Sequence, residues 1–111
     1  MRVFPIDGVA GGFETIGTTT SSIGFTAATI TPTTGNFAGL LAKAAVISVE
    51  TADIRFTIDG TVPTVTSGTG AGHLLENGSS FIIYGEKNVA NFRCINAVGS
   101  SGAKVKCTYL F

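Results

Sequence analysis

Apolar and polar side chains alternate most regularly within residues 46–64, VISVETADIRFTIDGTVPT. Ile54, Phe56 and Ile58 are apolar while the residues between them are polar, and this period of two predicts a strand with one buried face. The run VISV predicts another strand just before it, with ETAD as a short connection. Asp59-Gly60 ends the later strand because these residues favour turns. We interpret the two strands as the folding nucleus of a β-domain.

The N-terminal residues 1–13 are predicted to be an arm or edge segment, because a proline and several glycines interrupt their apolar side chains. Phe4 and Ile6 have no obvious place in the strand pattern that follows. We therefore expect these two side chains to contact another subunit. Residues 14–111 are predicted to form one β-sandwich domain.

Residues 14–34, ETIGTTTSSIGFTAATITPTT, are rich in threonine, serine and isoleucine, which favours extended structure. We predict two edge strands in this segment, with Ile23 and Phe25 facing the same way. The next segment, 35–45, has a spacing compatible with a short helix and also with a strand that begins near Leu41. We interpret it as the start of the strand that includes VISV.

Two hairpins are predicted in the last third of the chain. The first joins HLL to SFIIY through Asn77-Gly78, because both residues tolerate positive φ. Residues 85–88 form another turn, and the second hairpin covers 89–111 with its tip at 99–102. A symmetric tip places three pairs of side chains opposite each other on one aromatic and sulfur-rich face. These pairs are Phe92 with Tyr109, Cys94 with Cys107, and Asn96 with Val105, and the other face carries Arg93, Lys104, Lys106 and Thr108.

The predicted strands together define an all-β fold. A chain of 111 residues is long enough for one core but not for two. About six to eight strands separated by turn residues are typical of a single antiparallel β-sandwich or jelly roll. The 15 glycines and many threonines suit turns and strands and disfavour long helices.

Charge narrows the partners that such a domain is expected to bind. Seven basic and seven acidic residues give a formal net charge of zero, and charged residues make up only 13% of the chain. A nucleic-acid partner is not expected, because binding to phosphates needs a basic face. The N-terminus has no secretory pattern, and the most apolar stretch, 39–49, contains Lys43 and is too short to span a bilayer. We therefore expect a protein made in a cytoplasm that binds other protein and not a membrane.

Candidate chemistry is sparse. Two cysteines predict neither a disulfide scaffold nor a zinc site, and in a reducing cytoplasm we expect buried free thiols rather than a cross-strand disulfide. A single histidine without an adjacent nucleophile is interpreted as structural, and the acidic residues near the nucleus strands as surface charges. No catalytic residue, cofactor or metal is expected. The residues considered are Cys94, Cys107, His73, Glu50, Asp53 and Asp59.

Four segments of this sequence resemble small structural proteins of tailed bacteriophages. They are ADIRFTIDGTVPT at 52–64, GHLL at 72–75, NFR at 91–93 and VKCTYLF at 105–111, in about the C-terminal half to two thirds of the chain. The resemblance implies a non-enzymatic β-sandwich of the virion, made in the host cytoplasm, of the capsid decoration or cement type. It also implies a homo-oligomer whose partners are the major capsid protein or other virion proteins, and it carries no active-site residues.

The shorter piece FTIDGTVPT, residues 56–64, is also similar to the DGTxPT turn of chitobiase-type and related accessory β-sandwich domains. This resemblance implies an alternative function, a carbohydrate-binding module of a phage tail or fibre. Against it, the chain has no Trp and only two Tyr, whereas sugar-binding platforms commonly use flat aromatic faces.

Overall fold

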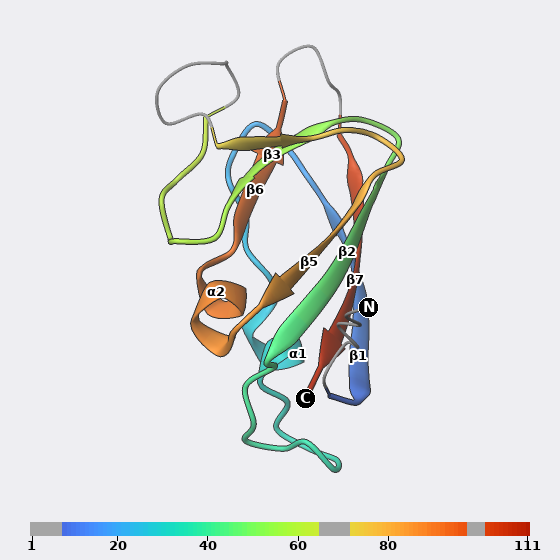
Figure 1. Ribbon diagram of the computed structural model, residues 1–111, viewed down its shortest axis with the longest axis vertical. Coiled ribbons are helices and arrows are strands. Elements are labelled where there is room, and N and C mark those ends of the chain that lie inside the picture. Colours follow the sequence, from blue (N-terminus) through green and yellow to red (C-terminus); the bar gives the residue numbers. More distant parts are fainter. Residues whose placement is uncertain (1–7, 65–71, 98–101) are drawn as a thin grey trace, which may run out of the picture.

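The structure is a computed structural model that describes residues 8–64, 72–97 and 102–111. Within these residues the chain forms seven strands in two antiparallel sheets that pack together as a sandwich, with two short helices (Figure 1). The predicted all-β antiparallel sandwich of six to eight strands is confirmed. The strands are β1 (Ala10–Gly17), β2 (Ala44–Glu50), β3 (Ile54–Thr57), β4 (His73–Leu75), β5 (Ser80–Tyr84), β6 (Arg93–Asn96) and β7 (Lys104–Leu110), and the helices are α1 (Ala27–Ile30) and α2 (Glu86–Asn91).

The larger sheet has the strand order β1-β7-β2-β5. Its two central strands, β7 and β2, direct alternate apolar side chains into the space between the sheets, where Ile47, Val105 and Tyr109 are completely buried. Three side chains of β7 that alternate with these, Lys104, Lys106 and Thr108, are exposed or half-buried. The predicted two-faced pattern of this last strand is therefore confirmed.

The smaller sheet has the strand order β4-β3-β6, and its strands are only three or four residues long. Ile54 and Phe56 of β3 are buried, as the alternation predicts, and pair with Asn96 and Cys94 of β6. The two nucleus strands, β2 and β3, lie in different sheets. Their short connection therefore leads from one layer of the sandwich to the other and does not close a hairpin.

Both predicted hairpins are wrong for the same reason. The turn at Asn77-Gly78 exists, and Gly78 has a φ of +90°, but it leads from β4 in the smaller sheet to β5 in the larger one. Its Gly78 N–H donates to the Val49 carbonyl at 2.8 Å, which fixes the turn at the end of β2. Likewise, β6 and β7 lie in different sheets, so the predicted pairs do not form. The six residues concerned are nevertheless all buried: Phe92, Cys94, Asn96, Val105, Cys107 and Tyr109.

The two cysteines are free and buried, as expected. Cys94 belongs to β6 of the smaller sheet and Cys107 to β7 of the larger one. Burial raises the pKa of both thiols to about 12, so both are protonated at neutral pH.

Three further segments differ from their predicted structure. Two edge strands were predicted within residues 14–34. The edge strand β1 continues to Gly17, and only an isolated bridge between Ile23 and Cys94 forms between it and α1. Segment 35–45 contains turns and no helix, and β2 begins at Ala44. The turn predicted at 85–88 and the beginning of the second hairpin form α2 instead, because the fully buried Val89 packs into the core from this helix.

The N-terminal segment joins the larger sheet as an edge strand. β1 starts at Ala10, so the predicted boundary between 13 and 14 falls inside a strand at the edge of the larger sheet. The pairing of β1 with β7 shifts between Ala10 and Gly12. A Cβ atom on Gly11 would lie only 2.6–2.7 Å from the rings of Phe37 and Phe111, so a larger residue at this bulge would have to displace these stacked rings. Phe4 and Ile6, the predicted intersubunit contacts, lie outside the described residues.

Candidate functional site

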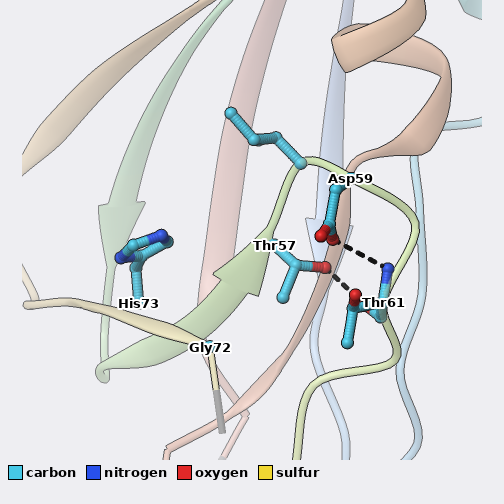
Figure 2. A pocket seen from close by; sticks show the side chains of 6 residues that line it. Thr57, Asp59, Thr61, Gly72 and His73 are labelled. Carbon is cyan, nitrogen blue, oxygen red and sulfur yellow. Dashed lines mark hydrogen bonds between the residues drawn. The ribbon is translucent and has the colours of Figure 1, made fainter. Parts of the chain in front are cut away.

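An open cleft of about 360 Å³ lies where β3 ends and β4 begins (Figure 2). The Asp-Gly-Thr turn that follows β3 supplies one side, and the first residues of β4 supply the other. Residues 57–61 and 72–73 are distant in sequence, and the antiparallel pairing of β3 with β4 brings them together. The lining residues are Thr57, Ile58, Asp59, Thr61, Gly72 and His73.

The turn on one side of the cleft is held by its own side chains. The Asp59 carboxylate accepts a hydrogen bond from the Thr61 N–H at 3.0 Å, and the Thr57 hydroxyl donates to the Thr61 carbonyl. Gly60, between them, has a φ of +89°, which favours glycine. The tight turn predicted at Asp59-Gly60 is therefore present. It presents a carboxylate and two hydroxyl groups at the cleft (Figure 2).

The cleft contains an anionic group at neutral pH. The hydrogen bond from the Thr61 backbone N–H, together with the Thr61 side chain, lowers the pKa of the fully exposed Asp59 carboxyl. The exposed His73 ring lies across the cleft from Asp59 (Figure 2). Its centroid is 5.5 Å from that of the Phe56 ring. A carboxylate, hydroxyl groups and an imidazole can hydrogen-bond the hydroxyl or amide groups of a small polar ligand.

The other candidate residues do not join this cleft. Asp53 accepts a hydrogen bond from the Asn77 N–H at 2.8 Å, so it stabilises the turn between β4 and β5. Glu50 is exposed and lies opposite Lys104 in the register of β2 with β7. Among the described residues, no group of three or more His, Cys, Asp or Glu side chains is placed to hold a metal ion. In the same part of the chain, no helix has the length and apolar character needed to cross a membrane.

A second candidate site is the outer face of the larger sheet. Strand register places Phe13, Val46 and Ile82 in one row across this face, with Thr108 between the first two. The neighbouring row toward one end contains Tyr84. Phe13 is 63% exposed and Tyr84 49% exposed. We call this half of the face the apolar end, and it comprises Phe13, Val46, Ile82 and Tyr84.

The other half of the same face is polar. The next two rows contain the lysines of β7 together with serine, threonine and glutamate side chains. Lys106 Nζ donates to the Thr15 hydroxyl at 3.2 Å within one of these rows. We call this half the polar end, and it comprises Thr15, Gly17, Ser48, Glu50, Ser80, Lys104 and Lys106.

Sequence reasoning missed the apolar end because its members come from three separate strands, β1, β2 and β5, and β7 lies between the first two. It also missed a polar contact beneath β1, where Glu14 accepts hydrogen bonds from the hydroxyls of Tyr109 and Thr26. The carboxylate lies on the core side of the edge strand, and burial raises the pKa of Tyr109. The sequence signal for either feature depends on knowing the strand order, which alternation does not provide.

Comparisons of this chain with models of known protein families, with curated proteins and with solved structures find no match.

Proposed function

We propose that this protein is a non-enzymatic structural component of a bacteriophage virion, a decoration or cement protein that binds the assembled capsid. The observation that carries the proposal is the apolar end of the outer sheet face, where Phe13 and Tyr84 are strongly exposed. Apolar side chains that gather on one exposed sheet face and are bordered by polar residues are typical of protein-binding surfaces.

The rest of the chain is consistent with such a surface. A net charge of zero removes the long-range repulsion that opposes dense packing of many copies on a particle. The mechanism is mechanical: the protein binds the assembled lattice and not the separate subunits, so its binding energy stabilises the lattice by mass action. The major capsid protein is the proposed partner. The resemblance to phage structural proteins described above supports the same partner.

The test uses particles of the phage that encodes this chain, produced with and without it. We expect particles that lack the protein to release DNA at a lower temperature, and purified protein to bind them and restore their heat resistance. Tyr84→Asp should abolish binding, because a charge in the apolar end must be desolvated in the interface. Ser80→Asp is the matched control on the same strand and face, within the polar end, and should bind normally. Absence of the protein from purified virions, or equal binding by both variants, contradicts the proposal.

A second candidate function, carbohydrate binding on a tail or fibre, rests on the cleft. The DGT turn lines it, and Asp59, Thr57 and Thr61 present oxygen atoms there. A charged carboxylate accepts stronger hydrogen bonds from sugar hydroxyls than a neutral amide does. A glycan array followed by titration of any hit should show saturable binding that Asp59→Asn weakens. Binding to capsids without binding to glycans would favour the first function.

A further inference from the structure

The four sheet edges of the sandwich differ in how much of their backbone is already used. β4 has only three residues, and β6 is flanked by the segment around Ile23, which bonds to Cys94 in both directions. At the β5 edge, the side chain of Asn88 donates to the Tyr84 carbonyl at 2.8 Å. β1 has eight residues and pairs only with β7. It is therefore the longest edge in the described part of the chain.

The backbone of β1 points alternately toward β7 and away from it. Thr18 N–H donates to the Ala103 carbonyl at 3.0 Å, so Thr18 faces β7. Counting back in an antiparallel ladder, Ile16 and Glu14 also face β7, whereas the N–H and C=O groups of the residues between them face outward. Within the described residues, no hydrogen bond reaches those outward groups. They belong to Phe13, Thr15 and Gly17.

The edge also carries few of the features that prevent strands from pairing. The sequence of β1, AGGFETIG, contains no lysine, arginine or proline. Its single charged residue, Glu14, is on the core side and hydrogen-bonded to Tyr109. The bulge lies at the N-terminal end of the strand, between Ala10 and Gly12, away from the three outward-facing residues.

We propose that β1 is a dimerisation edge that pairs antiparallel with β1 of a second copy of this chain, with Thr15 on the two-fold axis. In this register Phe13 lies opposite Gly17 of the partner subunit, and Thr15 lies opposite Thr15 of the partner subunit. All three outward-facing residues then form hydrogen-bonded pairs, which gives six backbone hydrogen bonds across the axis. The two larger sheets become one sheet of eight strands.

The side chains of the outer face fit this register and favour a second copy as the occupant. Phe13 is 63% exposed, and the residue opposite it is a glycine, so the ring can lie over the partner's backbone. A Cβ atom on Gly17 would be 3.6 Å from Lys104 Nζ, so the ammonium group lies beside the same open position. The Phe13 ring of one copy thus meets the Lys104 ammonium of the other, a cation–π contact. Symmetry makes this contact twice.

The geometry also limits the size of the assembly. An isologous pairing uses the β1 edge of both copies, so no further copy can join at this edge and the assembly is a dimer. Interfaces that consist of one edge strand and two aromatic side chains are small and typically transient, below about 1,200 Å². Val46, Ile82 and Tyr84 lie on other strands and stay open in the dimer. The inference does not depend on capsid binding, because it concerns the isolated protein.

The first experiment is disulfide trapping of the register. Thr15→Cys places a thiol on the two-fold axis, with Cα atoms about 5.5 Å apart, within the range that a disulfide spans. We expect mild oxidation of the folded variant to give a covalent dimer. Ser80→Cys is the matched control, exposed on the outer face of the opposite edge strand, and should stay monomeric. The native cysteines are completely buried and do not compete.

The second experiment measures association without cross-linking. Sedimentation from about 5 to about 500 μM should show a monomer–dimer equilibrium for the unaltered protein. Phe13→Ser should weaken dimerisation at least tenfold, and Lys104→Gln by about two- to fivefold, as expected for a cation–π contact. Leu74→Ser, which removes an apolar side chain of β4 that is 48% exposed, should leave dimerisation unchanged.

Two results would overturn the proposal. One is a monomer at every concentration, with Thr15→Cys cross-linking no faster than Ser80→Cys. The other is a dimer that Ser80→Cys traps and Thr15→Cys does not, because it would use the β5 edge. A dimer that forms as proposed but fails to bind capsids would leave this inference intact and contradict only the proposed function.

Discussion

The two sheets of the sandwich differ in length, in burial and in what they present to solvent. The larger sheet has strands of five to eight residues, and its two central strands supply many of the completely buried side chains. The smaller sheet has strands of three or four residues and continues into the turn that lines the cleft. The difference indicates that the larger sheet supplies most of the stability and a broad contact surface. The smaller sheet supplies a polar recess.

The largest expected effect is the difference in stability between a truncation at the centre of the larger sheet and one at the edge of the smaller sheet. Ile47→Ala, in the centre of the larger sheet, should lower the free energy of unfolding by about 2–5 kcal/mol, because the residue is completely buried. Leu75→Ala, which truncates a half-buried residue of the edge strand β4 in the smaller sheet, should cost about 1 kcal/mol. Denaturation in urea measures both. Equal costs would show that the sheets contribute alike and would contradict the comparison.

The next effect concerns the core that the sheets share. The pKa values of the Cys94 and Cys107 thiols rise from 9.0 to about 12 on folding, so the unfolded chain loses these protons at lower pH than the folded protein does. The contribution of the protonated thiols to the free energy of unfolding is complete below pH 9 and is lost as the pH rises toward 12. Between pH 9 and pH 10, the free energy of unfolding should fall by about 1 kcal/mol for each thiol.

Single variants test whether both sheets bury their thiol equally. Cys94→Ala removes the thiol of the smaller sheet and Cys107→Ala that of the larger one. Each should remove about half of the decrease between pH 9 and pH 10, measured by urea denaturation at each pH. If one variant keeps the full decrease, its thiol is accessible in the folded protein, and the core is less continuous than the structure shows.

The comparison also explains which parts of the fold could be predicted from the sequence. Alternation identified the buried faces of β3 and β7 correctly, because side-chain direction is a local property of a strand. It could not identify the partner of a strand. Asn77-Gly78 forms a turn whether the chain reverses within one sheet or passes to the other. The distinction depends on contacts such as the bond from Gly78 N–H to the Val49 carbonyl, which joins distant residues.

The candidate sites show the same limit. The Asp-Gly turn was predicted because its conformational preference lies in two adjacent residues. The position of His73 across the cleft depends on the pairing of β3 with β4 and could not be predicted. The apolar end requires the order of all four strands. Helix α2 was missed because it has only six residues, and the burial of Val89 rather than helix propensity stabilises it.

The smallest expected effect is confined to the cleft. The pKa of Asp59 is lowered below its ordinary value of 3.8 by the hydrogen bond from Thr61 N–H. The ionised carboxylate therefore stabilises the turn above about that pH, and the stabilisation is lost as the pH falls through the lowered value. Because Asp59 is fully exposed, the larger sheet should be unaffected.

An NMR titration should show the Thr61 amide proton shifting upfield as Asp59 becomes protonated, while the amides of β2 and β7 stay constant. Asp59→Asn should abolish the titration, and Asp53→Asn, which alters a different turn, should preserve it. A Thr61 titration that persists in Asp59→Asn would show that another group controls the turn, and amides of β7 that follow the same curve would show that the two sheets do not respond independently.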